Sequence, residues 1–262
     1  IGDISGRGKL GGDMREIWLM QPRFDRRTPS GAAGLASQPR FRAGYDFLRL
    51  RADAGEVDAE LAEWWEDFSL GDADEREALL KAAQDPAWPC EPVVVLANKP
   101  DAGGLEKARG FGVKAVAVDH KIYGKDREAF ERAMNAAIEA EGVELIALAG
   151  FMRVLTPWFV NQWAGRLINI HPALLPKYPG VDTHNRALAA GDLVHGCTVH
   201  QVTAGVDEGP VIGSAEVDVV AGDTEATLAA RVLKAEHVLY PRCLAAVARG
   251  GGTRVRDDVV VD

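Results

Sequence analysis

The sequence predicts an α/β protein with a mostly parallel, doubly wound (Rossmann-like) sheet, preceded by an irregular or helical N-terminal segment. The first observation is a regular alternation, from about residue 74, of short apolar runs with helical patterns. The second is that these runs are rich in β-branched residues, as is typical of buried strands. The expected strands are 92–97, 113–118, 144–149, 166–171, 197–202 and 211–220, and the expected helices are 77–84, 103–110, 126–140, 156–163 and 224–248.

Two of these helices have clear end signals. Acidic residues open the helix at 126–140, where the positive end of the helix dipole favours them. Asp223 and Thr224 mark the start of the helix at 224–248, and three glycines follow its end. We therefore expect a long helix to close the fold.

The strand at 166–171 carries two polar side chains near its end, Asn169 and His171. Residues two apart in a strand point to the same face, so the amide and the imidazole emerge together. Pro172 then ends the strand, and ligands of open α/β sheets bind beyond the carboxyl ends of strands. The pair suits carbonyl chemistry, because an amide donates to an oxyanion and an imidazole moves a proton. A hydrogen-bonded polar pair with no catalytic role is the alternative.

Composition limits the classes of function. The chain has 262 residues and a net charge of −9, which argues against a general nucleic-acid binder. We find no signal peptide and no apolar run near the roughly 20 residues that span a bilayer, so we expect a cytoplasmic protein without a membrane partner. The three scattered cysteines indicate neither a disulfide framework nor a metal site, and no metal is expected. The oligomeric state stays open.

The N-terminal segment, 1–73, differs in character from the rest. Ser5-Gly6-Arg7-Gly8 has the composition of a phosphate-binding loop, although short glycine clusters are common in tails and we expect a flexible tail here. Residues 13–72 combine aromatic residues with many arginines and resemble the C-terminal region of bacterial poly(A) polymerases, with Pro39-Arg40-Phe41-Arg42-Ala43-Gly44-Tyr45 among the matching motifs. The arginines could contact RNA phosphates, or this could be a small helical appendage with a solvated basic face.

The rest of the chain, from about Ala78 to Gly250, resembles the phosphoribosylglycinamide formyltransferase family. Four motifs occur in order with compatible spacing: Ala149-Gly150-Phe151-Met152-Arg153-Val154-Leu155, Asn169-Ile170-His171-Pro172-Ala173-Leu174-Leu175-Pro176, Gly196-Cys197-Thr198-Val199-His200-Gln201-Val202 and Gly205-Val206-Asp207-Glu208-Gly209-Pro210. The resemblance implies the formyltransferase fold. It also implies transfer of a formyl group from 10-formyltetrahydrofolate to the amine of glycinamide ribonucleotide in purine biosynthesis.

The resemblance assigns the catalytic roles to Asn169, His171 and Asp207. Asn169 and protonated His171 would stabilise the oxyanion, and His171 would pass a proton to the departing folate nitrogen. Asp207 would favour the imidazolium form of His171. Taken alone, Asp207 could equally be a turn-forming residue.

The resemblance also implies binding residues for both substrates. Those expected to bind folate are Arg127, Phe151, Met152, Arg153, Val154, Leu155, Val202 and Val206, and those expected near the ribonucleotide are Gly150, Pro172 and Glu236. Apolar walls suit a planar heterocycle, and an arginine suits the carboxylates of its tail. Core packing and solvated helix faces are the alternatives for the same residues.

One departure from the family concerns its phosphate loop, a Ser-Gly-x-Gly-Ser-Asn sequence between the first strand and the first helix. The residues that precede the helix here, 70–75, are acidic and would repel a phosphate. Either an insertion separates Ser5-Gly6-Arg7-Gly8 from this helix, or the first strand is absent and the chain joins two unrelated pieces; we expect the second. The expected domains are therefore 1–73, 74–250 for the formyltransferase, and a tail at 251–262.

Two rival functions remain open at this point. The first is another 10-formyltetrahydrofolate enzyme of the same fold, either the deformylase or the methionyl-tRNA formyltransferase. Pro172 and the Thr183-His184 pair favour the ribonucleotide enzyme instead. The second is an RNA-binding accessory module in residues 13–72.

Overall fold

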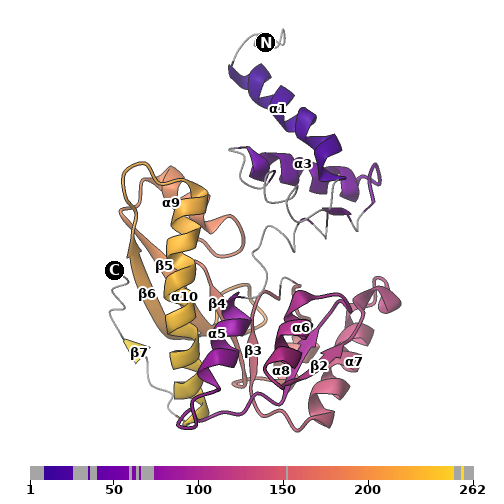
Figure 1. Cartoon of the computed structure of the whole chain (residues 1–262), viewed down its shortest axis with the longest axis vertical. Helices are drawn as coiled ribbons and strands as arrows, with labels where there is room; N and C mark the ends of the chain where they lie inside the picture. Colours follow the sequence, from indigo (N-terminus) through magenta and orange to yellow (C-terminus); the bar gives the residue numbers. More distant parts are fainter. Residues whose placement is uncertain are drawn as a thin grey trace. The chain divides into compact units, whose positions relative to one another are not determined.

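The computed structural model (Figure 1) describes residues 9–25, 35, 40–58, 61–62, 65, 74–151, 153–250 and 255–256. The chain divides into two compact units, Ile1–Asp72 and Ala73–Asp262. The phosphate-loop candidate at residues 5–8 lies outside the described residues.

The first unit is helical, with α1 at Lys9–Phe24 and α3 at Phe41–Asp53. Its core is aromatic. The Trp65 ring is fully buried and lies edge-on to Phe24, with ring centroids 4.9 Å apart. The Trp65 Nε1 atom also donates to the Phe24 carbonyl at 2.6 Å. This unit therefore has a hydrophobic cluster of its own.

The second unit alternates helices and strands, as the pattern of the sequence predicts. Its elements are α5 (Asp74–Ala82), β1 (Val94–Ala97), α6 (Gly103–Gly110), β2 (Lys114–Ala117), the 3₁₀ helix η1 (His120–Tyr123), α7 (Arg127–Ala140), β3 (Ile146–Leu148), α8 (Pro157–Gln162), β4 (Leu167–His171), α9 (Thr183–Ala190), β5 (Val194–Gln201), β6 (Val211–Asp218), α10 (Glu225–Ala248) and β7 (Val255–Arg256). The α/β class is confirmed. The short helices η1 and α9 are additions to the expected elements, and so is strand β7, which lies in the expected tail at 251–262.

The strands form two sheets, which differs from the single sheet expected. β1 and β2 pair in parallel, and a five-stranded sheet has the order β3-β4-β5-β6-β7. The β3–β4 and β6–β7 pairs are parallel, whereas β4–β5 and β5–β6 are antiparallel. The sequence pattern missed this reversal because apolar runs predict strands but not their directions: β5 is antiparallel to β4 although helix α9 lies between them, and β6 follows β5 through a loop without a helix.

Helix α10 anchors the five-stranded sheet. Its first turn is capped by Thr224, whose side chain accepts a hydrogen bond from the Thr227 amide. One face of α10 is buried against β4, β5 and β6. Its Tyr240 hydroxyl donates to the carbonyl of Leu148 in β3 at 2.6 Å and lies 3.3 Å from that of Ile168 in β4. Within the described residues, none of the helices has the length and apolar character required to cross a membrane.

Candidate active site

The candidate site is built at the carboxyl end of β4. Leu167 and Ile168 are fully buried and hold the strand in the core, while Asn169 is half-buried and His171 is buried. The Asn169 and His171 side chains therefore leave the same face of one rigid strand.

Asp207 lies at this end of β4 and belongs to the loop between β5 and β6. Its backbone adopts a left-handed conformation, with φ of 54°. One carboxylate oxygen, Oδ2, lies 3.3 Å from Nδ1 of His171 and accepts a hydrogen bond from the Gly180 amide at 2.8 Å. The three residues predicted to be catalytic thus share one site, although no direct bond joins Asn169 to the other two.

His200 joins Asn169 to Asp207, and no role was predicted for it. Its Nε2 atom lies 3.4 Å from Nδ2 of Asn169 and 3.5 Å from Oδ1 of Asp207. The antiparallel register of β4 and β5 places Asn169 directly opposite His200. In the sequence, His200 is visible only as a polar residue within an apolar strand. The pairing of β5 with β4 is needed to show that its side chain lies on the same face as that of Asn169.

The charges of the site follow from these contacts. Burial would raise the pKa of Asp207, but hydrogen bonds from His200 and the Gly180 amide outweigh it and lower that pKa. Burial lowers the pKa of His171, while the Tyr178 carbonyl and the Asp207 charge oppose the shift. At neutral pH the site therefore contains a carboxylate beside an imidazole that is free to accept a proton.

The segment that follows His171 in the chain, and that contains Tyr178, contacts the imidazole at the ring nitrogen that does not face Asp207. The Nε2 atom of His171 lies 2.9 Å from the Tyr178 carbonyl, to which it can donate. Behind this segment, Nε2 of His195 lies 3.2 Å from Nδ1 of His184. Burial, with a further contribution from His195, lowers the pKa of His184 to about 4. A neutral pair of histidines therefore supports the segment at pH 7.

Part of the predicted folate-binding set gathers in one place. Phe151, Leu155 and Val202 are half-buried and pack against the cluster formed by α7, α8 and Leu167. Val202 is also tied to β4, because its amide donates to the Leu167 carbonyl at 2.9 Å.

The remaining members of that set are spread over the surface. Val154 and Val206 are exposed to 62% and 55% respectively, as the walls of an open apolar site would be. The Arg153 guanidinium lies 5.5 Å from the Phe130 ring centroid. Arg127 is exposed at the first position of α7, while Met152 lies outside the described residues.

The residues predicted to lie near the ribonucleotide have mixed surroundings. Gly150 follows β3 with a φ of 62°, and Pro172 is half-buried beside His171. Glu236 of α10 is 4% exposed, and its Oε1 atom has no hydrogen-bond partner. Burial, with a contribution from the Glu75 carboxylate, raises the pKa of Glu236 to about 8. Glu75 belongs to the first turn of α5, so acidic residues do occupy the start of this helix.

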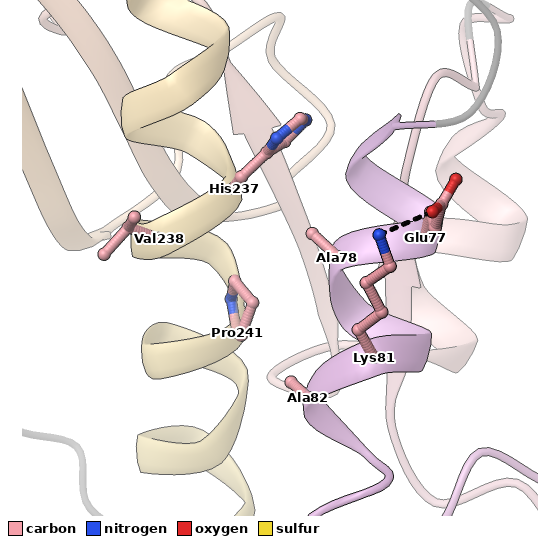
Figure 2. A pocket seen from close by; sticks show the side chains of 7 residues that line it. All are labelled: Glu77, Ala78, Lys81, Ala82, His237, Val238 and Pro241. Atoms are coloured by element: carbon pink, nitrogen blue, oxygen red, sulfur yellow. Dashed lines mark ion pairs between the residues drawn. The ribbon is translucent and has the colours of Figure 1, made fainter.

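A cleft of about 410 Å³ lies between α5 and α10 (Figure 2). Its lining residues are Glu77, Ala78, Lys81, Ala82, His237, Val238 and Pro241. Lys81 is paired with Glu77 at 2.6 Å. None of the predicted site residues lines this cleft.

Comparison with known proteins assigns the second unit to a family. The family model described as formyl transferase matches residues 68–244. The chain belongs to the formyl transferase family. A second family model, described as the arginine-rich C-terminus of polymerase A, matches residues 1–91, so both predicted resemblances are confirmed.

Individual relatives agree with membership of the formyl transferase family. The phosphoribosylglycinamide formyltransferase of Escherichia coli is 47% identical over 156 residues, which cover 60% of this chain and 73% of that protein. The trifunctional purine biosynthetic protein adenosine-3 of Drosophila melanogaster is 44% identical over 176 residues, 66% of this chain. The match covers only 13% of that longer protein.

Solved structures show the same formyl transferase fold. The phosphoribosylglycinamide formyltransferase of Brucella melitensis matches with a TM-score of 0.64 and 48% identity, over 69% of this chain and 93% of that one. The enzyme of Coxiella burnetii, in complex with CHES, matches with a TM-score of 0.65 and 40% identity, over 69% and 84% of the two chains.

Proposed function

We propose that this chain is a cytoplasmic enzyme that transfers the formyl group of 10-formyltetrahydrofolate to the amine of glycinamide ribonucleotide. One observation carries the proposal: the Asp207 carboxylate lies 3.3 Å from His171 and 3.5 Å from His200, beside Asn169. This combination offers an oxyanion donor, a proton carrier and a fixed negative charge at one strand end.

In the proposed reaction, a bond forms between the amine nitrogen and the formyl carbon, and the bond from that carbon to the folate nitrogen breaks. The folate supplies the activated formyl group. The Asn169 amide donates to the formyl oxygen as it becomes negative. Since the amine loses a proton and the folate nitrogen gains one, the site needs a group that carries a proton, and His171 is positioned to do so.

Asp207 and His200 have supporting roles in this proposal. The Asp207 carboxylate stabilises the charged form of His171 during proton transfer. The Gly180 amide and His200 hold that carboxylate in place. The Nε2 atom of His200 also lies 3.4 Å from Nδ2 of Asn169, so its ring packs beside the amide.

We assign the folate ring to the apolar surface around Phe151, Leu155 and Val202, with the exposed Val154 and Val206 at its mouth. These side chains fit a planar heterocycle, because aliphatic and aromatic walls bury its faces. Arg153 and Arg127 would bind the carboxylates of the tail. We also assign Met152 to this group from the resemblance alone.

We assign the ribonucleotide to the neighbourhood of Gly150, Pro172 and Glu236. The unpartnered oxygen of Glu236 would accept a hydrogen bond from a ribose hydroxyl. Because α5 begins with Asp74 and Glu75, its dipole is opposed by carboxylates and phosphate binding there would be weak. We therefore propose a low affinity for the ribonucleotide.

The experiment is a formyl-transfer assay on the full chain. The purified protein is incubated with 10-formyltetrahydrofolate in three arms. The first arm contains glycinamide ribonucleotide, the second contains methionyl-tRNA, and the third contains no acceptor other than water. Formylated ribonucleotide is the expected product. Formate release without transfer, or formylated methionyl-tRNA, would instead favour one of the two rivals of the same fold, and no product in any arm would contradict all three.

A further inference from the structure

One short stretch of backbone, residues 178–182, contacts both members of the His171–Asp207 pair. The Tyr178 carbonyl lies 2.9 Å from Nε2 of His171. Two residues later, the Gly180 amide donates to Oδ2 of Asp207 at 2.8 Å. This oxygen is also the one that lies 3.3 Å from Nδ1 of His171. A displacement of the 178–182 stretch would therefore disturb both members of the pair at once.

The 178–182 stretch has an unfavourable backbone conformation. Tyr178, Gly180 and Asp182 have φ values of 55°, 78° and 62°, so all three are left-handed. Residues with a Cβ atom disfavour this conformation, and two of the three carry one. Backbone strain of this kind persists only where surrounding contacts hold it. Contacts with other elements are therefore needed to keep the stretch in place.

Helix α9 supplies such contacts through Arg186. The Nη1 atom of Arg186 donates to the Pro179 carbonyl at 2.7 Å and to the Val181 carbonyl at 3.3 Å. The guanidinium carbon lies 5.1 Å from the centroid of the Tyr178 ring. In the part of the chain that the structure describes, all hydrogen bonds of Arg186 go to this stretch and none goes to a carboxylate. This indicates that Arg186 holds backbone rather than neutralising a charge.

The peptide group between Pro179 and Gly180 links Arg186 to Asp207. This group is trans, so it is planar and its carbonyl and amide point in opposite directions. Its carbonyl accepts from Arg186, and its amide donates to the Asp207 carboxylate. Rotation of the peptide plane would break both hydrogen bonds. Arg186 thus sets the direction in which the Gly180 amide donates.

A separate contact holds the beginning of the stretch. The Tyr178 hydroxyl donates to Oδ2 of Asp192 at 2.7 Å, and Nζ of Lys177 lies 3.1 Å from the same oxygen. These contacts fix side chains, whereas Arg186 fixes the backbone. A substitution of Arg186 leaves the Asp192 contacts available, so its effect on the Pro179–Gly180 peptide can be measured by itself.

We propose that Arg186 is a positioning residue for formyl transfer, which orients the Pro179–Gly180 peptide so that Asp207 stays beside His171. This inference rests on the proposed function of the site. Arg186 acts through the 178–182 stretch and not on the reacting groups. Its loss should therefore lower kcat, because a small displacement of Asp207 weakens its support of His171, and should leave KM for both substrates nearly unchanged.

The test compares Arg186→Met with the unmodified full chain. Methionine keeps much of the length of the side chain but has no donor. We expect kcat for formyl transfer to fall at least tenfold, while KM for each substrate changes less than twofold. Arg186→Lys can bond one carbonyl, so its kcat should be intermediate. It also carries the comparison if Arg186→Met does not fold.

The pH profile gives a readout that a purely structural role would not move. The hydrogen bond from the Gly180 amide lowers the pKa of Asp207, so its loss should move the acid limb of kcat/KM to higher pH. The other groups that face Asp207, His171 of β4 and His200 of β5, stay unchanged in both variants. Arg186→Lys keeps the positive charge beside His171, so a shift in both variants reflects the lost backbone contacts.

Hydrogen exchange at the Gly180 amide measures the same contact without an activity assay. Exchange should be at least tenfold faster in Arg186→Met than in the unmodified chain. The matched control is Arg231→Met, because Arg231 donates to the Asp218 carbonyl at 2.7 Å, at the end of β6. This control loses an equally short backbone contact elsewhere and should keep a normal kcat and normal exchange at Gly180. Thermal unfolding reports any general loss of stability.

Several results would overturn the proposal. They are a normal kcat for Arg186→Met, unchanged exchange at Gly180, full activity of Arg186→Lys, and an equal fall in kcat for Arg231→Met. A higher KM for the ribonucleotide with a normal kcat would make Arg186 a binding residue and would also overturn it. If the unmodified chain transfers no formyl group, the proposed function fails. Exchange at Gly180 and titration of Asp207 followed by NMR then still decide whether Arg186 holds the pair.

Discussion

The Oδ2 atom of Asp207 lies 3.3 Å from Nδ1 of His171, held there by a left-handed backbone at Asp207 and by the Gly180 amide. Since Nε2 of the same imidazole faces the Tyr178 carbonyl, both ring nitrogens meet acceptors. Burial lowers the pKa of His171, while the Tyr178 carbonyl and the Asp207 charge oppose this shift by favouring the charged form. This balance suits a group that gains and loses a proton in each turnover.

Replacement of Asn169 by alanine should lower the rate of formyl transfer by about 10²–10³-fold, because the developing oxyanion would lose its donor. Folate binding should change little, since Asn169 is not among the apolar residues assigned to that site. Single-turnover kinetics and folate titration measure the two effects. Asn161→Ala, at an exposed position of α8, is the matched control. Near-normal turnover of Asn169→Ala would contradict the proposed role.

Replacement of His200 by leucine should shift the acid limb of the rate profile to higher pH. The hydrogen bond from His200 lowers the pKa of Asp207, so its loss lets the carboxylate take up a proton at a higher pH. Activity that depends on the carboxylate is then lost earlier as the pH falls. The measurement is kcat/KM against pH, and His200→Gln should restore part of the profile by donating again. An unchanged acid limb would argue for a packing role alone.

His184 should make the free energy of unfolding depend on pH. Its pKa is lowered to about 4 in the folded chain, so between pH 6.5 and 4 the unfolded chain binds the extra proton. Stability is lost as the pH falls through this window, by roughly 1–3 kcal/mol after allowance for partial exposure. Urea unfolding at several pH values would reveal this loss, and His184→Gln should flatten the dependence. A variant with the same pH slope would exclude His184 as its source.

Gly209→Ala should lower the rate of formyl transfer because it displaces Asp207, which lies two residues earlier in the same loop. A Cβ atom at Gly209 would collide with the Gln201 carbonyl oxygen, so the loop that carries Asp207 must move. Gly110→Ala is the control, because a Cβ atom there meets nothing within 4 Å. We expect a fall of at least tenfold in kcat for the first variant and a normal rate for the second. Circular dichroism checks that both remain folded.

Trp65→Ala should unfold the first unit and spare the second, because the two units have separate cores. Loss of a fully buried tryptophan costs about 3–5 kcal/mol, which is enough to unfold a small unit. Limited proteolysis should then cut within residues 1–72 while formyl transfer continues. Loss of transfer would mean that the enzyme depends on the first unit. A filter-binding assay with RNA on the same variant tests the RNA-binding alternative for residues 13–72.

Many helices and strands of the second unit could be predicted because the sequence patterns that specify them lie within the elements themselves. The amphipathic pattern of α7, the capping residues of α10 and the apolar run of β4 each specify an element without reference to the rest of the chain. Strand direction is not local in this way, and the antiparallel β5 was missed. The short helix α9 was also missed, since its eight residues combine weak periodicity with polar side chains.

The sequence predicted which side chains meet at the end of β4 better than it predicted their geometry. The i, i+2 spacing placed Asn169 and His171 on one face of a strand, and the structure confirms that arrangement. The bridging position of His200 depends on the register of β4 against β5, which no local pattern specifies. The burial of Glu236 near Glu75 likewise depends on how α5 packs against α10.

The Tyr240 hydroxyl has a consequence for how the chain assembles. It reaches carbonyls that lie 92 and 72 positions earlier in the chain, one in each of two neighbouring strands. If β3 slipped by one residue against β4, the carbonyl of Leu148 would face the other way, and the buried phenol would keep only its longer contact with the Ile168 carbonyl. The last long helix thus docks fully only on correctly aligned strands. A residue of α10 thus selects the alignment of strands that were synthesised well before it.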